Sequence, residues 1–132
     1  MKSWIRFTTP ILRTAALLAV VLVLSSTGLA QRGSITAPVN PELEAESRHN
    51  LDVGRQYFKR KAWAGALGRL EEIIATNPEF TRIDEVYFIA GVCYSHRDEI
   101  ELARKMLQLV IDEHSESEFV KRAREELAKL PK

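Results

Sequence analysis

The feature that most constrains the fold of this 132-residue chain is an internal repeat. The same residue types recur at the same spacing, with the second copy 37 residues after the first. The first copy comprises Gly54, Tyr57, Ala66, Leu70 and Pro78, and the second comprises Gly91, Tyr94, Ala103 and Leu107, with Ser115 in place of the proline. A period of about 20 to 50 residues is typical of folds that stack similar supersecondary units. Two such units are therefore expected over about residues 47–115.

The residue types at these positions suit helices that pack against helices. In each copy the glycine has no side chain and the alanine has a small one, so two helix backbones can approach closely there. The tyrosine is expected to fill the space beside them, and the leucine to close the core.

Apolar spacing and helix-end signals divide the chain after residue 40 into helices. Asn40, Pro41 and Glu42 supply an N-cap, a proline at the first helical position and an early acid. The stretches 81–84 (Thr-Arg-Ile-Asp) and 115–118 (Ser-Glu-Ser-Glu) resemble capping boxes. Helices are expected over about residues 41–60, 62–76, 81–96, 98–113 and 115–130. No stretch alternates with a period of two residues, so the chain is predicted to be all-α.

The glycine–tyrosine–alanine–leucine pattern resembles the tetratricopeptide repeat, a helix–turn–helix unit of about 34 residues. The resemblance implies a fragment of a right-handed α-solenoid with repeats at about 47–80 and 84–117 and a capping helix at about 117–130. Since about three repeats are usually needed for stability, an open end of the array could be covered by a partner or by a second copy.

The first repeat carries a narrower resemblance. Its aromatic pair, cationic turn and second aromatic precede an alanine and an arginine, at Tyr57-Phe58, Lys59-Arg60-Lys61, Trp63, Ala66 and Arg69. This order resembles the opening repeat of the BamD-like outer-membrane assembly lipoproteins. The resemblance implies a periplasmic scaffold that assists a β-barrel insertase by protein contact. That family carries a lipobox cysteine and more repeats, whereas this chain has Ala30-Gln31 and two repeats, and Leu70 replaces an aromatic.

Residues 1–30 have the order of a secretory signal peptide. Three cations, Lys2, Arg6 and Arg13, precede an apolar run at 15–24 and small residues at Gly28 and Ala30. Cleavage after Ala30 would make the protein periplasmic or secreted, and residues 31–40 read as a flexible tether. The alternative is an uncleaved inner-membrane anchor over residues 11–30, although the unbroken apolar run is short for a spanning helix.

Composition excludes several function classes. The 19 Lys and Arg balance 18 Asp and Glu, which gives no bulk electrostatic case for nucleic acid. One cysteine excludes an intrachain disulfide framework and a cysteine-cluster metal site. His49, His96 and His114 lack a metal-ligand spacing. No catalytic, cofactor or small-molecule signature is present, so a non-enzymatic protein without a cofactor or metal is expected.

In a stacked array, the first helix of each pair lines the concave face. Residues that point away from the glycine–tyrosine core there form a candidate partner-binding groove: Arg48, Leu51, Arg55, Phe58 and Lys59 in the first repeat, and Glu85, Phe88, Val92, Ser95 and His96 in the second. A peptide with an acid near a hydrophobic residue would suit this mixture of cationic and apolar residues. The alternative is that Phe58 and Phe88 belong to the core.

Three further features have two interpretations each. The cations Arg55, Lys59, Arg60 and Lys61 can offset the dipole at a helix end, or can meet an anionic partner surface or lipid headgroups. Trp63 is expected to pack against the preceding helix. Cys93 is expected to be a buried small hydrophobe, and the alternative is a nucleophile paired with His96.

Together these observations predict an exported scaffold or adaptor that binds another protein or peptide of the cell envelope, with outer-membrane β-barrel assembly as its more specific role. The alternatives are an accessory factor held by an uncleaved N-terminal helix and a scaffold that self-associates through its open repeat ends.

Overall fold

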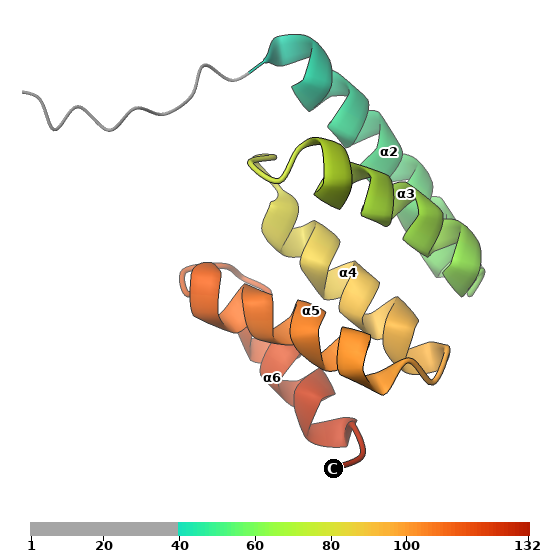
Figure 1. Cartoon of the computed structure of the whole chain (residues 1–132), viewed down its shortest axis with the longest axis vertical. Coiled ribbons are helices and arrows are strands. Elements are labelled where there is room, and N and C mark those ends of the chain that lie inside the picture. Colours follow the sequence, from blue (N-terminus) through green and yellow to red (C-terminus); the bar gives the residue numbers. More distant parts are fainter. Residues whose placement is uncertain (1–39) are drawn as a thin grey trace, which may run out of the picture. The chain divides into compact units, whose positions relative to one another are not determined.

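The computed structural model describes residues 40–132, and this part of the chain is all-α, as predicted. Its helices follow one another in chain order down the view of Figure 1: α2 (Pro41–Lys59), α3 (Trp63–Thr76), α4 (Ile83–His96), α5 (Ile100–Glu113) and α6 (Val120–Lys129). None of these helices is long and apolar enough to cross a membrane. The signal peptide and most of the tether predicted over residues 1–40 lie outside the described residues.

Helix α2 begins at Pro41 with Asn40 as its N-cap, as predicted. The Asn40 side-chain oxygen accepts hydrogen bonds from the backbone N–H groups of Glu42 and Leu43, at 3.1 and 3.4 Å. Pro41 occupies the first helical turn, where its missing N–H costs nothing. This cap therefore fixes where the helical array begins.

The two predicted capping boxes do not form. Thr81 lies before α4, and its hydroxyl donates to Glu44 of α2 rather than to the backbone of its own helix. After α5, the chain runs through a connection, and α6 begins only at Val120 without a side-chain cap. Ser117 in that connection donates to Asp84 of α4 at 2.6 Å. Thr81 thus serves a contact between helices, and Ser117 both contacts α4 and accepts from the Phe119 N–H at 3.1 Å just before α6.

The repeat is visible in the backbone as well as in the sequence. Lys61 and Asp98, 37 residues apart, both adopt a positive φ, of 59° and 63°. The following N–H groups, of Ala62 and Glu99, donate to the tyrosine carbonyls at 2.9 and 3.0 Å. Helices α3 and α5 start 37 residues apart, and so do α4 and α6. Helix α6 therefore occupies the place of the first helix of a third pair.

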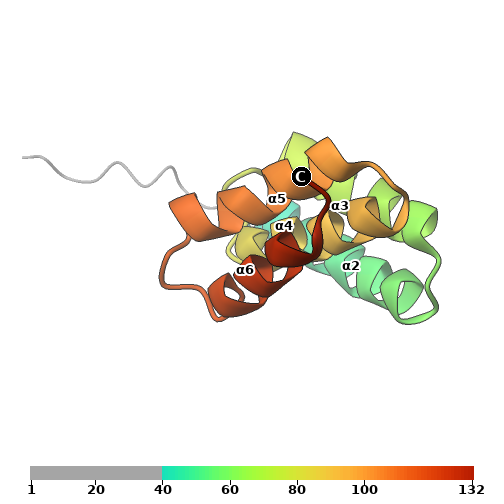
Figure 2. The ribbon, with the colours of Figure 1, turned by 90° about the horizontal axis from the view of Figure 1, so that it is seen from below.

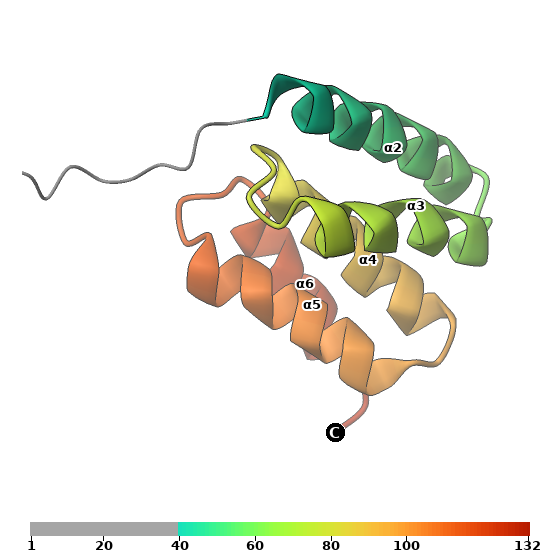
Figure 3. The same ribbon diagram turned by 45° about the horizontal axis from the view of Figure 1, so that its top comes forward.

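Helix α4 forms the centre of the array. Seen from below, α3 and α5 lie along one side and α2 and α6 along the other, with α4 between them (Figure 2). The view of Figure 3 shows the same order, with α4 enclosed by its neighbours. Every residue of α4 from Glu85 to Tyr94 is buried, which explains why its sequence is apolar on all faces.

The repeat glycines lie where partner helices approach most closely. A methyl group added at Gly54 would lie 3.2 Å from Leu70 Cδ2, and one added at Gly91 would lie 2.7 Å from Leu107 Cγ. Ala66 and Ala103 are fully buried at the same crossings. Each first helix thus meets its second helix over a glycine and a leucine.

The two repeat tyrosines differ. Tyr57 is 36% exposed and lies over Gly65, where an added methyl would be 3.0 Å from its ring, instead of filling the space beside Gly54. Tyr94 is buried, and its hydroxyl donates to Glu71 of α3 at 2.6 Å. Helix α3 of the first repeat lies against Tyr94, whereas Tyr57 belongs to α2, the first helix that the structure describes.

Three glycine substitutions should separate helix propensity from packing. Gly68→Ala, with no atom near the added methyl, should raise the free energy of unfolding by about 0.5–1 kcal/mol. Gly91→Ala should lower it by about 1–3 kcal/mol, because the methyl overpacks Leu107. The change in the free energy of unfolding for Gly54→Ala should lie between those for Gly68→Ala and Gly91→Ala. Urea unfolding followed by circular dichroism measures the order, and an equal effect at Gly68 and Gly91 would contradict the packing described.

Candidate protein-binding surface

A buried ion pair connects α2 to α4. Arg55 Nε donates to Glu85 Oε1 at 2.7 Å and its Nη2 donates to Oε2 at 2.6 Å, across 30 residues of sequence. Arg82 also pairs with Glu85, and Asp52 accepts from Arg55 at 2.9 Å. Only 9% of the Glu85 side chain is exposed, and these guanidinium groups compensate the cost of burying its charge. The pair fixes how the first repeat sits on the second.

An aromatic cluster connects α2, α3 and α4 at the end of the array where α2 and α4 terminate. Phe58 meets Trp63 edge-on, with ring centroids 5.6 Å apart. Trp63 in turn stacks on His96, with centroids 4.2 Å apart and an interplanar angle of 5°. Trp63 thus packs against the preceding helix, as predicted, and also against α4.

The opposite half of α4 is covered by α6 and the chain before it. Phe88 stacks on Phe119 at 5.2 Å, and the Arg122 guanidinium lies 4.5 Å from the centre of the Phe88 ring. A cation over an aromatic face is electrostatically favourable. This packing removes Phe88 from solvent, with 3% of the residue exposed.

The structure corrects the predicted groove. Leu51, Glu85, Phe88 and Val92 are buried, so they offer no open surface to a partner. Glu85 forms ion pairs with Arg55 and Arg82. Phe88 is covered by Phe119 and Arg122, and Leu51 is part of the hydrophobic core. The remaining predicted residues are at least partly exposed and are here called the adaptor face: exposed Arg48, Lys59 and His96, and half-buried Arg55, Phe58 and Ser95.

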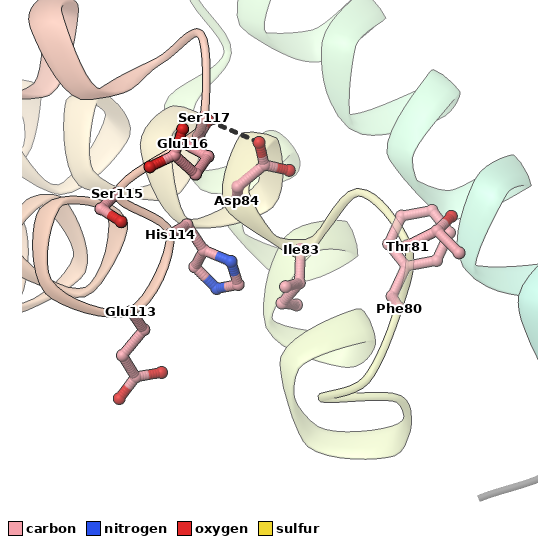
Figure 4. Close-up of a pocket in the computed structure, with 9 residues that line it drawn as sticks. All are labelled: Phe80, Thr81, Ile83, Asp84, Glu113, His114, Ser115, Glu116 and Ser117. Carbon is pink, nitrogen blue, oxygen red and sulfur yellow. Dashed lines mark hydrogen bonds between the residues drawn. The ribbon is translucent and has the colours of Figure 1, made fainter. Parts of the chain in front are cut away.

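A cleft that the sequence did not indicate opens at the other end of the helices, between the α3–α4 and α5–α6 connections (Figure 4). It encloses about 360 Å³ above the buried residues Phe80 and Ile83. Its walls are formed by Thr81, Asp84, Glu113, His114, Ser115, Glu116 and Ser117. Its lining therefore contains three carboxylates.

Beside the cleft, the second repeat lacks a hydrogen bond that the first repeat forms at the equivalent positions. In the first repeat, Asn77 of the α3–α4 connection donates to Ser47 of α2 at 3.0 Å, and both are buried. The residues 37 positions later are His114 and Asp84. Asp84 instead accepts from Ser117, and His114 lies against the ring of Tyr87 with centroids 6.0 Å apart. The α5–α6 connection is therefore fixed by other contacts than the α3–α4 connection, and the cleft lies beside the α5–α6 connection.

Cys93 lies in the interior of α4, as expected for a small hydrophobe. The residue is fully buried, and burial raises the pKa of its thiol from 9.0 to about 12. A neutral thiol is a poor nucleophile. The ring of His96, the suggested partner, is stacked on Trp63. This geometry does not favour covalent chemistry at Cys93.

The other candidate groups are dispersed. Within residues 40–132, no three His, Cys, Asp or Glu side chains gather closely enough to hold a metal ion. Of the four clustered cations, Arg55 faces Glu85, while Lys59, Arg60 and Lys61 are exposed at the α2–α3 turn.

No family model, curated protein or solved structure matches this chain.

Removing one partner of the buried ion pair should cost more than removing both. Arg55→Ala should lower the free energy of unfolding by about 1–3 kcal/mol, because Glu85 keeps its charge in a buried site with only Arg82 beside it. Arg55→Met combined with Glu85→Leu should recover most of that loss. Urea unfolding of both variants measures the difference, and a double variant no more stable than Arg55→Ala would contradict the cost assigned to an unpaired Glu85.

Cys93 should be protected from reagents and should make the fold sensitive to alkali. The folded state holds the thiol proton up to about pH 12 and the unfolded chain only to about 9.0, so stability falls as pH rises between these values. A thiol-reactive dye should label the protein slowly until urea unfolds it. Cys93→Ala should weaken the loss of unfolding free energy above about pH 9, and an unchanged pH profile would contradict the assignment.

Proposed function

We propose that this protein is a non-enzymatic adaptor of the cell envelope, built as a short tetratricopeptide-type array, that binds a segment of another protein on its adaptor face. The observation that carries the proposal is the repeated construction of the helix pairs. Turn dihedral angles, turn hydrogen bonds and glycine–leucine crossings recur with the same spacing of 37 residues. Folds that stack such units characteristically serve as extended binding surfaces.

The surface chemistry supports binding rather than catalysis. The adaptor face combines exposed cations, Arg48 and Lys59, with the half-buried ring of Phe58. This ring lies against Trp63, which is held on its other side by His96, so the aromatic surface is rigid before a partner arrives. Preorganised aromatic and cationic side chains lower the entropic cost of binding a peptide. The matching ligand is an extended segment with an acid near a hydrophobic residue.

The location and the specific role are part of the same proposal. The signal-like order of residues 1–30 supports export, and the resemblance of residues 51–70 to BamD-like lipoproteins supports a role in outer-membrane assembly. The chain has Ala30-Gln31 where that family carries a lipobox cysteine.

Site-specific photocrosslinking in the cells that make the protein tests the proposal. A photoreactive amino acid at Arg48, on the adaptor face, should give adducts with another envelope protein, identified by mass spectrometry. The same group at Lys105, an equally exposed cation on α5, is the control and should give few or none. Adding Ser95→Glu should reduce the Arg48 adduct by about fivefold or more through like-charge repulsion with an acidic partner, whereas Gln108→Glu should not.

Each other outcome has a definite meaning. Equal adducts from positions 48 and 105 would overturn the adaptor face. Adducts with a second copy of this chain alone would replace the adaptor by a self-associating scaffold. An envelope partner unrelated to outer-membrane assembly would keep the adaptor function and overturn the assembly role.

A further inference from the structure

Three cations stand side by side at the tip of the first repeat. Lys59, Arg60 and Lys61, here called the basic turn, connect α2 to α3 and are all exposed. In the described part of the chain, none of them forms an ion pair with an acid within 4.0 Å. The basic turn is therefore a concentrated positive charge that intramolecular contacts do not neutralise.

The second repeat provides an internal comparison. Its equivalent turn has the same positive φ and the same backbone hydrogen bonds but consists of His96, Arg97 and Asp98. There the arginine is paired, with Nε 2.6 Å from Glu99 Oε1. The shape of the turn and the end of the preceding helix thus do not require three free cations. Lys59 and Arg60 can offset the dipole at the end of α2, but the turn does not need a cation at position 61, where the second repeat has Asp98.

The surroundings of the basic turn are aromatic. Tyr57, one turn of helix before it, is 36% exposed, and Trp63, two residues after it, is half-buried. Rings with an apolar body and a polar tip favour the boundary between water and lipid. The acids that line the cleft, Asp84, Glu113 and Glu116, lie at the opposite end of the helices. An anionic surface would therefore attract one end of the molecule and repel the other.

We propose that the basic turn docks this protein on the surface of an anionic lipid bilayer, with Lys59, Arg60 and Lys61 at the headgroups and Tyr57 and Trp63 beside them. A bilayer fits better than an acidic peptide because the three exposed cations are flanked by Tyr57 and Trp63, whose rings suit the boundary between water and lipid. The apolar run at residues 15–24, with its signal-like flanks, also directs the chain to a membrane. The basic turn shares Lys59 with the adaptor face, but its docking is tested on lipid vesicles without a protein partner.

Quenching of a fluorophore by spin-labelled lipid headgroups tests the docking in the full chain. The dye is attached to Ala62→Cys beside the basic turn or, as the control position, to Ser115→Cys at the cleft end. Cys93 is buried and stays unlabelled. On vesicles of phosphatidylcholine with about one third phosphatidylglycerol, the dye at position 62 should be quenched several-fold more than the dye at 115. On phosphatidylcholine alone the difference should disappear.

Neutralising the basic turn should abolish this docking. Since each cation near an anionic surface contributes about fivefold, Lys59→Gln/Arg60→Gln/Lys61→Asn should weaken it roughly 100-fold. Asn tolerates the positive φ at position 61, so the turn is kept. Lys105→Gln/Lys121→Gln/Arg124→Gln removes the same charge from exposed positions on α5 and α6 and should leave the quenching unchanged.

Four results would overturn the proposal. Stronger quenching at position 115 would show that the protein meets vesicles only through its N-terminal segment, since α2 begins at that end. Quenching at position 62 that survives neutralisation of the basic turn would show that these cations do not dock the protein. Quenching of the same size on vesicles without phosphatidylglycerol would show the same. A dye at position 62 that responds to a polyglutamate peptide but not to vesicles would assign the basic turn to an acidic protein.

Discussion

The close approach of helix backbones over a glycine and a leucine is the constraint on which the rest of this structure depends. At Gly91 the room for even a methyl group is missing, since Leu107 Cγ would lie 2.7 Å away. This contact sets the separation of α4 and α5, and the turn through Asp98 then closes in a single conformation. The same contact at Gly54 and Leu70 builds the first pair. Stacking the two pairs encloses α4, whose burial provides the core of the array.

The charges follow from this packing. Burial of Glu85 between the repeats requires compensating cations, which Arg55 and Arg82 supply. Arg55 is therefore paired with Glu85. Of the candidate cationic cluster, the three residues of the basic turn stay exposed and form no ion pair within residues 40–132. The connections at the other end carry the carboxylates of the cleft. The exposed cations of the basic turn and the carboxylates of the cleft therefore lie at opposite ends of the helices.

The helices and their repeat could be predicted because their signals are local. Asn40 caps the helix it precedes, and the glycines mark crossings that depend on residue size alone. The exposed surface was predicted less accurately than the helices, because it depends on contacts between distant segments. Thr81 has the spacing of a capping residue, but Glu44 reaches it from another helix. Phe88 has the position of a groove residue, but Phe119 and Arg122 cover it. The cleft depends on how Asp84 and His114 replace a buried hydrogen bond, which spacing does not reveal.

The central claim is that two helix pairs close in the same way, 37 residues apart. Nuclear Overhauser contacts in the folded protein test it most directly, because they report proximity without altering a residue. The account predicts strong cross-peaks from the Leu70 methyls to the Gly54 Hα protons and from the Leu107 methyls to the Gly91 Hα protons, the second pair being the stronger. Cross-peaks at one crossing and none at the other would contradict it, since the two pairs would then not share one geometry.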